Sequence, residues 1–158
     1  MSLNTKEQWM AYALLEAEKA QVHNEVPVGA VIVRNNKIIG QGFNQMIMNN
    51  DPTAHAEMVA LRQAAQVIQN YRLPECDLYV TLEPCMMCLG AMVHARIRTL
   101  YFGTKEPKAG VICSKASFYT LPFLNHYLNV EGGVLASKAS DILKAFFKQR
   151  RLQKKYNK

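Results

Sequence analysis

The sequence lacks any apolar run as long as the roughly 18 residues of a membrane-spanning helix. It also lacks the apolar core and cleavage site of a signal peptide, because Glu16 and Glu18 interrupt the early apolar stretch. No internal repeat, low-complexity tract or linker is present. We therefore expect a cytoplasmic protein with no membrane partner, folded as a single domain over residues 1–158.

Cysteine is scarce. The four cysteines, Cys76, Cys85, Cys88 and Cys113, would allow at most two disulfides. In a reducing compartment, metal binding or simple burial is the better expectation for such residues. The sequence thus argues against a disulfide framework and draws attention to Cys85 and Cys88, which are separated by two methionines.

Acidic residues are fewer than basic ones, 12 against 19, and the net charge is +7. Residues 138–158 contain eight of the basic residues and one acidic residue, so this segment accounts for the whole excess. A localised basic segment is typical of a surface that binds a polyanion, with nucleic acid favoured over membrane because no lipidation signal is present. The alternative is a last helix whose charges only keep the protein in solution.

The hydrophobic pattern predicts helices that alternate with strands. The expected order is helix 5–22, strands 27–33 and 38–44 joined at Asn35–Asn36, helix 55–69, strand 77–82, helix 84–95, strand 98–103, strand 127–130 and a basic helix at about 137–155. Residues 104–126 have no clear pattern. The alternation predicts an α/β protein with three layers, α/β/α, around a mixed sheet. Sites in such folds lie beyond the C-terminal ends of strands.

Two short strings combine chemically useful residues, "TAHAE" at residues 53–57 and "PCMMC" at residues 84–88. Cys85 and Cys88 are one helical turn apart, so their sulfurs can occupy adjacent corners of a tetrahedron. If the two helices pack on the same side of the sheet, their N-termini bring His55 to this pair. Three protein ligands leave a fourth position for water, as in catalytic zinc sites. Glu57 would then serve as the general acid and base.

Each of these residues also has a simpler interpretation. His55 and Glu57 can be an ordinary helix start, because an acidic side chain there interacts favourably with the helix dipole. The cysteines can be core thiols, a redox pair, or part of a closed structural zinc site with a fourth ligand from Cys76, Cys113, His94 or His126. The combination of four residue types, two spacings and two helix starts favours catalytic zinc.

His-x-Glu followed by Pro-Cys-x-x-Cys is the signature of the zinc-dependent cytidine deaminase superfamily, which this sequence resembles. The segments "EVPVGAVIV", "DPTAHAE", "LYVTLEPCMMC" and "AMVHARI" resemble the bacterial tRNA-specific adenosine deaminases, from about Trp9 to Arg151. The resemblance implies the five-stranded cytidine deaminase-like fold, a homodimer, one Zn²⁺ per subunit and no nucleotide cofactor. It implies hydrolytic conversion of the wobble adenosine in an arginine tRNA anticodon stem-loop to inosine.

The resemblance also implies roles for single residues. The zinc ligands are His55, Cys85 and Cys88, and the proton shuttle is Glu57. The substrate-binding residues are Val28, Asn44, Ala56, Glu83 and Pro84. The RNA-binding residues are Glu106, Lys108, Phe147, Arg150 and Arg151, with Glu106 where the family commonly has aspartate. The alternative functions are deamination of a free base or nucleoside (guanine or cytidine), and zinc-stabilised RNA binding without catalysis.

Overall fold

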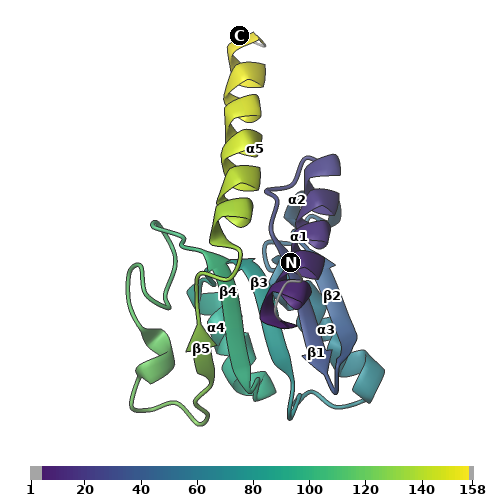
Figure 1. Ribbon diagram of the computed structural model, residues 1–158, viewed down its shortest axis with the longest axis vertical. Helices are drawn as coiled ribbons and strands as arrows, with labels where there is room; N and C mark the ends of the chain where they lie inside the picture. Colours follow the sequence, from purple (N-terminus) through teal and green to yellow (C-terminus); the bar gives the residue numbers. More distant parts are fainter. Residues whose placement is uncertain (1–4, 157–158) are drawn as a thin grey trace.

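The fold alternates helices and strands as predicted. A computed structural model describes residues 5–156 of the chain (Figure 1). The elements are α1 (Thr5–Val22), β1 (Gly29–Arg34), β2 (Lys37–Phe43), α2 (Met46–Asn49), α3 (Ala56–Ile68), β3 (Asp77–Leu82), α4 (Met86–Ala95), β4 (Thr99–Thr104), the 3₁₀ turn η1 (Phe118–Thr120), β5 (Asn129–Glu131) and α5 (Ala136–Tyr156). Between β4 and β5, where the sequence has no clear pattern, the chain forms loops and η1.

The five strands form one mixed sheet in the order β2-β1-β3-β4-β5. β1 is antiparallel to both β2 and β3, whereas β3, β4 and β5 are parallel to one another. The C-terminal ends of β2, β3, β4 and β5 therefore meet at one edge of the sheet. α3 follows β2 through α2, and α4 follows β3, so both helices begin at this edge.

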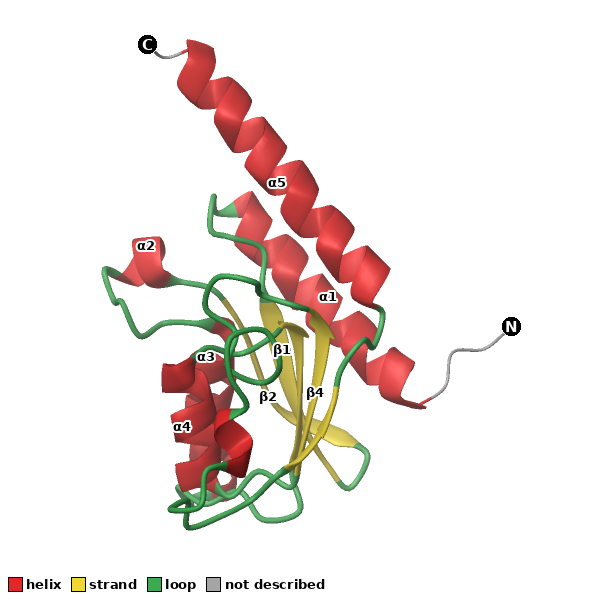
Figure 2. Ribbon diagram, turned by 90° about the vertical axis from the view of Figure 1, so that its left-hand side faces the viewer, coloured by secondary structure: helices red, strands yellow, loops and turns green. Residues whose placement is uncertain are grey.

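Helices cover both faces of the sheet, which confirms the predicted three-layer α/β/α arrangement. α3 and α4 lie on one face and α1 and α5 on the other (Figure 2). The larger apolar cluster fills the space under α3 and α4, and a smaller one joins α1 to the sheet. The central strands β1 and β3 are almost wholly buried because both of their faces are covered, which explains their continuous apolar sequences.

Two local predictions can be compared directly with the structure. The predicted hairpin is confirmed, since Asn35 and Asn36 join β1 to β2 with φ angles of 51° and 59°, the left-handed conformation that asparagine tolerates. The predicted start of α4 at Pro84 is two residues early. Backbone hydrogen bonds from Glu83 N to Thr104 O (2.9 Å) and from Val111 N to Pro84 O (3.1 Å) prolong the strand-like path, and the helix begins at Met86.

Across residues 5–156, none of the helices combines the length and the apolar character needed to cross a membrane. α5 packs beside α1 at its start and then extends beyond the sheet edge where α3 and α4 begin (Figures 1 and 2). This placement brings the basic end of the chain to the side of the sheet that carries the histidine and cysteine strings.

Candidate metal centre and active site

The N-termini of α3 and α4 present a histidine and a cysteine from their cap positions. His55 is the N-cap of α3 (φ −67°, ψ 154°) and Cys85 is the N-cap of α4 (φ −83°, ψ 175°), and neither side chain caps its own helix. The first free amide of α3, Ala56 N, instead donates to Asn44 Oδ1 at 2.9 Å. Because Asn44 satisfies this helix start, the His55 ring can face the other helix.

The three predicted ligands meet in space. His55 Nδ1 lies 3.6 Å from Cys85 Sγ and 3.5 Å from Cys88 Sγ. Zn–N bonds of about 2.05 Å and Zn–S bonds of about 2.3 Å at tetrahedral angles place nitrogen and sulfur about 3.6 Å apart. The two nitrogen–sulfur distances therefore match those of a tetrahedral zinc site, and all three donor atoms lie within 4.8 Å of one another.

The electrostatics of the thiols fit the same purpose. A hydrogen bond with Cys88 lowers the pKa of Cys85 to about 4, against the opposing effect of burial. The pKa of Cys88 is raised, first by its hydrogen bond with Cys85 and then by burial. A divalent metal ion bound here would take both cysteines as thiolates, because the thiolate is the metal-binding form.

The other candidate ligands lie elsewhere. Within the part of the chain that the structure describes, the cluster that can hold a metal consists of His55, Cys85 and Cys88. Cys76, Cys113, His94 and His126 are not members of it, and His126 Nε2 is 2.7 Å from Ile97 O. The alternative of a structural zinc site with four protein ligands therefore lacks a fourth ligand among the described residues. A zinc ion bound by these three residues would keep a coordination position for water.

Glu57 lines a cavity of about 170 Å³, together with the candidate metal ligands His55 and Cys85. Its side chain lies in the first turn of α3 and is 4% exposed. Burial raises the pKa of Glu57 to about 7, although its own backbone amide and His55 oppose the shift. A carboxyl group with a pKa near neutrality can both accept and donate a proton during one reaction.

Three of the five predicted substrate-binding residues line this cavity. They are Val28, Asn44 and Glu83. Asn44 is 5% exposed, and its Nδ2 donates to Val26 O at 3.0 Å while its Oδ1 accepts from Ala56. Ala56 and Pro84 are buried beside the cavity wall without lining it.

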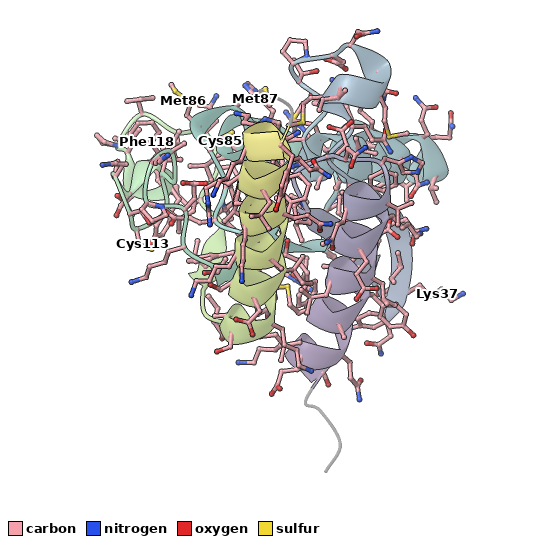
Figure 3. All side chains as sticks on the ribbon, turned by 90° about the horizontal axis from the view of Figure 1, so that it is seen from above. Lys37, Cys85, Met86, Met87, Cys113 and Phe118 are labelled. Carbon is pink, nitrogen blue, oxygen red and sulfur yellow. The ribbon has the colours of Figure 1, made fainter. Side chains whose placement is uncertain are left out.

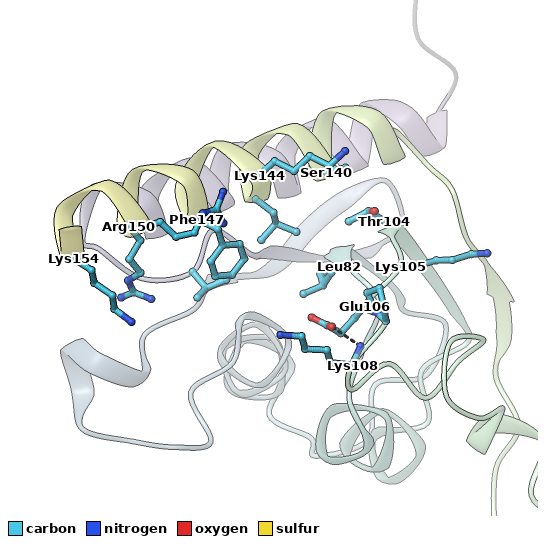
Figure 4. Close-up of a pocket in the computed structure, with 14 residues that line it drawn as sticks. Leu82, Thr104, Lys105, Glu106, Lys108, Ser140, Lys144, Phe147, Arg150 and Lys154 are labelled. Atoms are coloured by element: carbon cyan, nitrogen blue, oxygen red, sulfur yellow. Dashed lines mark hydrogen bonds between the residues drawn. The ribbon is translucent and has the colours of Figure 1, made fainter.

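A groove of about 870 Å³ runs beneath α5 (Figure 4) and adjoins the cavity. The two spaces share Val26, Leu82 and Glu106 in their walls. All five predicted RNA-binding residues line this groove, which brings together Glu106, Lys108, Phe147, Arg150 and Arg151. Three more basic residues, Lys105, Lys144 and Lys154, line the groove among apolar and neutral side chains.

Sequence reasoning missed several wall residues. In the cavity these are Val26, Met46, Leu82 and Ala109, and in the groove they include Ser140, Leu143, Lys144 and Lys154. The groove residues of α5 recur at positions 140, 143/144, 147, 150/151 and 154, which is the spacing of one helix face. That periodicity was a usable signal in the sequence. The cavity residues come from separate loops and strand ends, and no local pattern marks them.

The sequence is similar to those of known zinc-dependent deaminases. Residues 3–104 match the cytidine and deoxycytidylate deaminase zinc-binding region. The chain is 51% identical over 153 residues to the tRNA-specific adenosine deaminase of Haemophilus influenzae (96% of this chain, 88% of the relative). It is 43% identical over 144 residues to that of Agrobacterium fabrum (91% and 95%).

The fold is also similar to that of a solved structure. It comes from studies of A-to-I editing by tRNA:A34 deaminases at the wobble position of transfer RNA, and it superposes with a TM-score of 0.84 at 43% identity (86% of this chain, 99% of that chain). The match confirms the predicted five-stranded cytidine deaminase-like fold.

Fold and site together define a zinc-binding hydrolytic deaminase. The chain belongs to the family of tRNA-specific adenosine deaminases within the cytidine and deoxycytidylate deaminase group.

Proposed function

We propose that the protein deaminates the wobble adenosine of a tRNA anticodon, with an arginine tRNA as the expected substrate, and forms inosine. The observation that carries this proposal is that the cavity at Glu57 and the basic groove under α5 adjoin and share Val26, Leu82 and Glu106 in their walls. A deaminase of free bases needs the cavity, but it has no use for a cationic groove beside it. Relatives named for tRNA-specific adenosine deamination support the same substrate.

His55, Cys85 and Cys88 hold one zinc ion per subunit in this proposal. When bound, zinc supplies the Lewis acidity that activates a water molecule for attack on the base. Glu57 accepts one proton from that water and transfers it to the ring nitrogen. It then takes the second proton from the hydroxyl group added to the base and transfers it to the departing amine. Water adds its oxygen to the carbon that bore the amine, and ammonia leaves. The raised pKa of Glu57 allows its carboxyl group to perform both transfers near neutral pH.

The groove would bind the anticodon loop around the inserted base. Lys144, Arg150 and Arg151 supply positive charge for phosphates, and Phe147 is 41% exposed beside them. Single-stranded RNA is commonly held by phosphate contacts together with base stacking on aromatic rings. Phe146, by contrast, is 7% exposed and packs in the interior, so the two neighbouring phenylalanines have different tasks.

The experiment that tests the substrate compares four compounds. An anticodon stem-loop with adenosine at the wobble position should be converted to inosine, whereas free adenosine, cytidine and guanine should be deaminated far more slowly. A stem-loop with the adenosine moved into its paired stem serves as the control, because a base must leave its stack to enter the cavity. Faster conversion of free guanine or cytidine than of the stem-loop would exclude the proposed substrate.

We also propose that the described chain acts as one deaminase domain and that the protein works as a cytoplasmic homodimer. Large apolar side chains are exposed on α4 and after η1, where Met86 is 62% exposed, Tyr127 53% and Phe123 75%. Figure 3 shows Met86, Met87 and Phe118 on the same side of the molecule. Exposed large apolar side chains of this kind are candidates for a contact between subunits. Met92 and Val93, in contrast, are buried in the chain itself.

A further inference from the structure

A buried carboxylate outside the metal cluster organises the loop that separates the cavity from the groove. Glu83 follows β3, lies two residues before Cys85 and is 2% exposed. Its Oε2 accepts hydrogen bonds from the backbone amides of Ile112 (3.0 Å), Cys113 (2.8 Å) and Ser114 (3.0 Å). Its Oε1 accepts from Glu106 N at 3.0 Å and from the hydroxyl of Ser114.

These hydrogen bonds hold both ends of one segment, which we call the 106–114 loop. Glu106 is at its start and Ser114 at its end, and the same carboxylate binds both. The loop has no regular secondary structure, so its amides have no strand or helix partner there. The Glu83 carboxylate accepts hydrogen bonds from four backbone amides and so takes the place of the backbone hydrogen bonds that a strand or helix would provide.

The packing at Gly110 confirms how closely the loop surrounds the carboxylate. A Cβ atom at this position would lie 2.3 Å from Glu83 Cδ and 2.5 Å from each carboxylate oxygen. Only a residue without a side chain can pass this point while the amides on both sides remain within hydrogen-bond distance. The loop is therefore wrapped around the Glu83 carboxylate.

The 106–114 loop carries residues that line both the cavity and the groove. Glu106 and Ala109 line the cavity beside Glu57, and Glu106, Pro107 and Lys108 line the groove. Lys108 N also donates to Glu106 Oε1 at 2.9 Å, which couples the two polar residues of this wall (Figure 4). A shift of the loop would move the boundary between the cavity and the groove, because Glu106 lines both spaces.

We infer that Glu83 is a positioning residue, whose carboxylate fixes the 106–114 loop and thereby shapes the entrance through which the target base passes from the groove to the cavity. It acts through Glu106 and Ala109 and does not touch the reacting atoms. This inference rests on the proposed function for its substrate, although the loop geometry itself does not depend on that function. The sequence suggested a substrate-binding role for Glu83, and the positioning role specifies how its side chain would contribute.

The test uses Glu83→Gln in the full-length zinc protein. Glutamine has the same shape as glutamate, but one carboxylate oxygen is replaced by an NH₂ group. Backbone amides that donate to this oxygen in the wild-type protein would face another donor in the variant. Hydrogen exchange of the Ile112, Cys113 and Ser114 amides should accelerate about tenfold or more, because charged acceptors form the stronger hydrogen bonds. The KM for the anticodon stem-loop should rise about tenfold with a much smaller change in kcat, as expected for weakened substrate binding. Zinc content should stay at the wild-type level.

Two further variants keep the inference open to refutation. Ser114→Ala removes one donor and should change the same exchange rates and KM in the same direction by a smaller factor. Glu16→Gln is the matched control, because Glu16 is also a buried carboxylate (5% exposed) but lies on α1 beside Lys19. It should leave the loop amides and KM unchanged.

The outcomes separate this inference from the proposed function. Wild-type-like amide exchange and KM in Glu83→Gln would overturn the positioning role, and so would loss of zinc with a proportional fall in kcat, which indicates general unfolding. If the wild-type protein does not act on the stem-loop, the proposed substrate fails. The exchange data would still decide whether Glu83 holds the loop.

Discussion

At the scale of single residues, identical side-chain types differ in chemistry because their surroundings differ. Glu57 is buried without a cluster of donors, and burial raises its pKa to about 7. Burial also opposes ionisation of Glu83, but hydrogen bonds from Cys113, Ser114 and Glu106 outweigh it and lower the pKa to about 2. One carboxyl group can therefore exchange protons at neutral pH, while the other remains a fixed anion.

The role of Glu57 can be tested by replacing it with alanine. We expect Glu57→Ala to slow deamination by about 10²–10⁴-fold, which is the usual contribution of a general acid or base. Zinc content and stem-loop binding should remain near wild-type values, because His55, Cys85 and Cys88 are retained. Measurements of inosine formation, bound metal and stem-loop affinity on one preparation distinguish these effects. Undiminished inosine formation would disprove the mechanism, and Glu57→Gln controls for the volume of the side chain.

At the scale of elements, α5 has two roles: its first part packs on the protein core, and its later part forms a wall of the groove. Near its start, Ala139 is 2% exposed and packs towards the sheet, and Phe146 is 7% exposed. The C-terminal end of the helix projects from the body of the protein (Figure 1), and Tyr156 is 83% exposed. Arg150 lies over the Phe146 ring at 4.9 Å and donates to Asn24 O at 3.3 Å, so the groove end of the helix is still tethered.

Removal of residues 150–158 should therefore weaken RNA binding and leave the core folded. The truncated protein should show a higher KM for the stem-loop and a shallower dependence of affinity on salt, by about 0.7–0.9 in log–log slope for each phosphate that it no longer neutralises. The measurement is stem-loop affinity across a series of salt concentrations. Lys144→Ala and Lys148→Ala form a matched pair on the same helix, since only Lys144 lines the groove. Undiminished activity of the truncated protein on tRNA would contradict the role given to this end of α5.

At the scale of the whole molecule, the sheet edge gathers parts that are distant in the chain. The ends of β2, β3 and β4, the N-termini of α3 and α4, and the projecting part of α5 surround the cavity and the groove. The exposed apolar residues of α4 and the segment after η1 lie outside these walls. A second subunit can thus cover them without filling the groove.

The proposed homodimer predicts a solution mass of twice the 17.9 kDa chain. Burial of Met86 and Phe123 between subunits would supply the stabilising apolar area. Light scattering at working concentration measures this mass directly. A double variant, Met86→Lys with Phe123→Lys, should shift the mass towards that of one chain, whereas Tyr71→Lys, which replaces another exposed aromatic residue (69% exposed), should not. A monomer in the wild-type protein would refute the dimer.

The sequence by itself determined the class of chemistry and most of the elements. Both depend on short-range patterns: the spacing of Cys85 and Cys88 follows the helical turn, and "DLYVTL" predicts a buried strand at the residues that form β3. The exact start of α4 does not follow from such patterns, because backbone hydrogen bonds with Thr104 and Val111, distant in sequence, keep residues 83–85 extended.

Only the tertiary structure decided that His55 meets the two cysteines without a fourth described protein ligand, and that the groove and the cavity adjoin and share wall residues. It alone connected Glu83 to amides 23 to 31 residues away. Such hydrogen bonds join irregular segments of the chain, and irregular segments have no period in the sequence. They exist only once the sheet has placed its strand ends side by side.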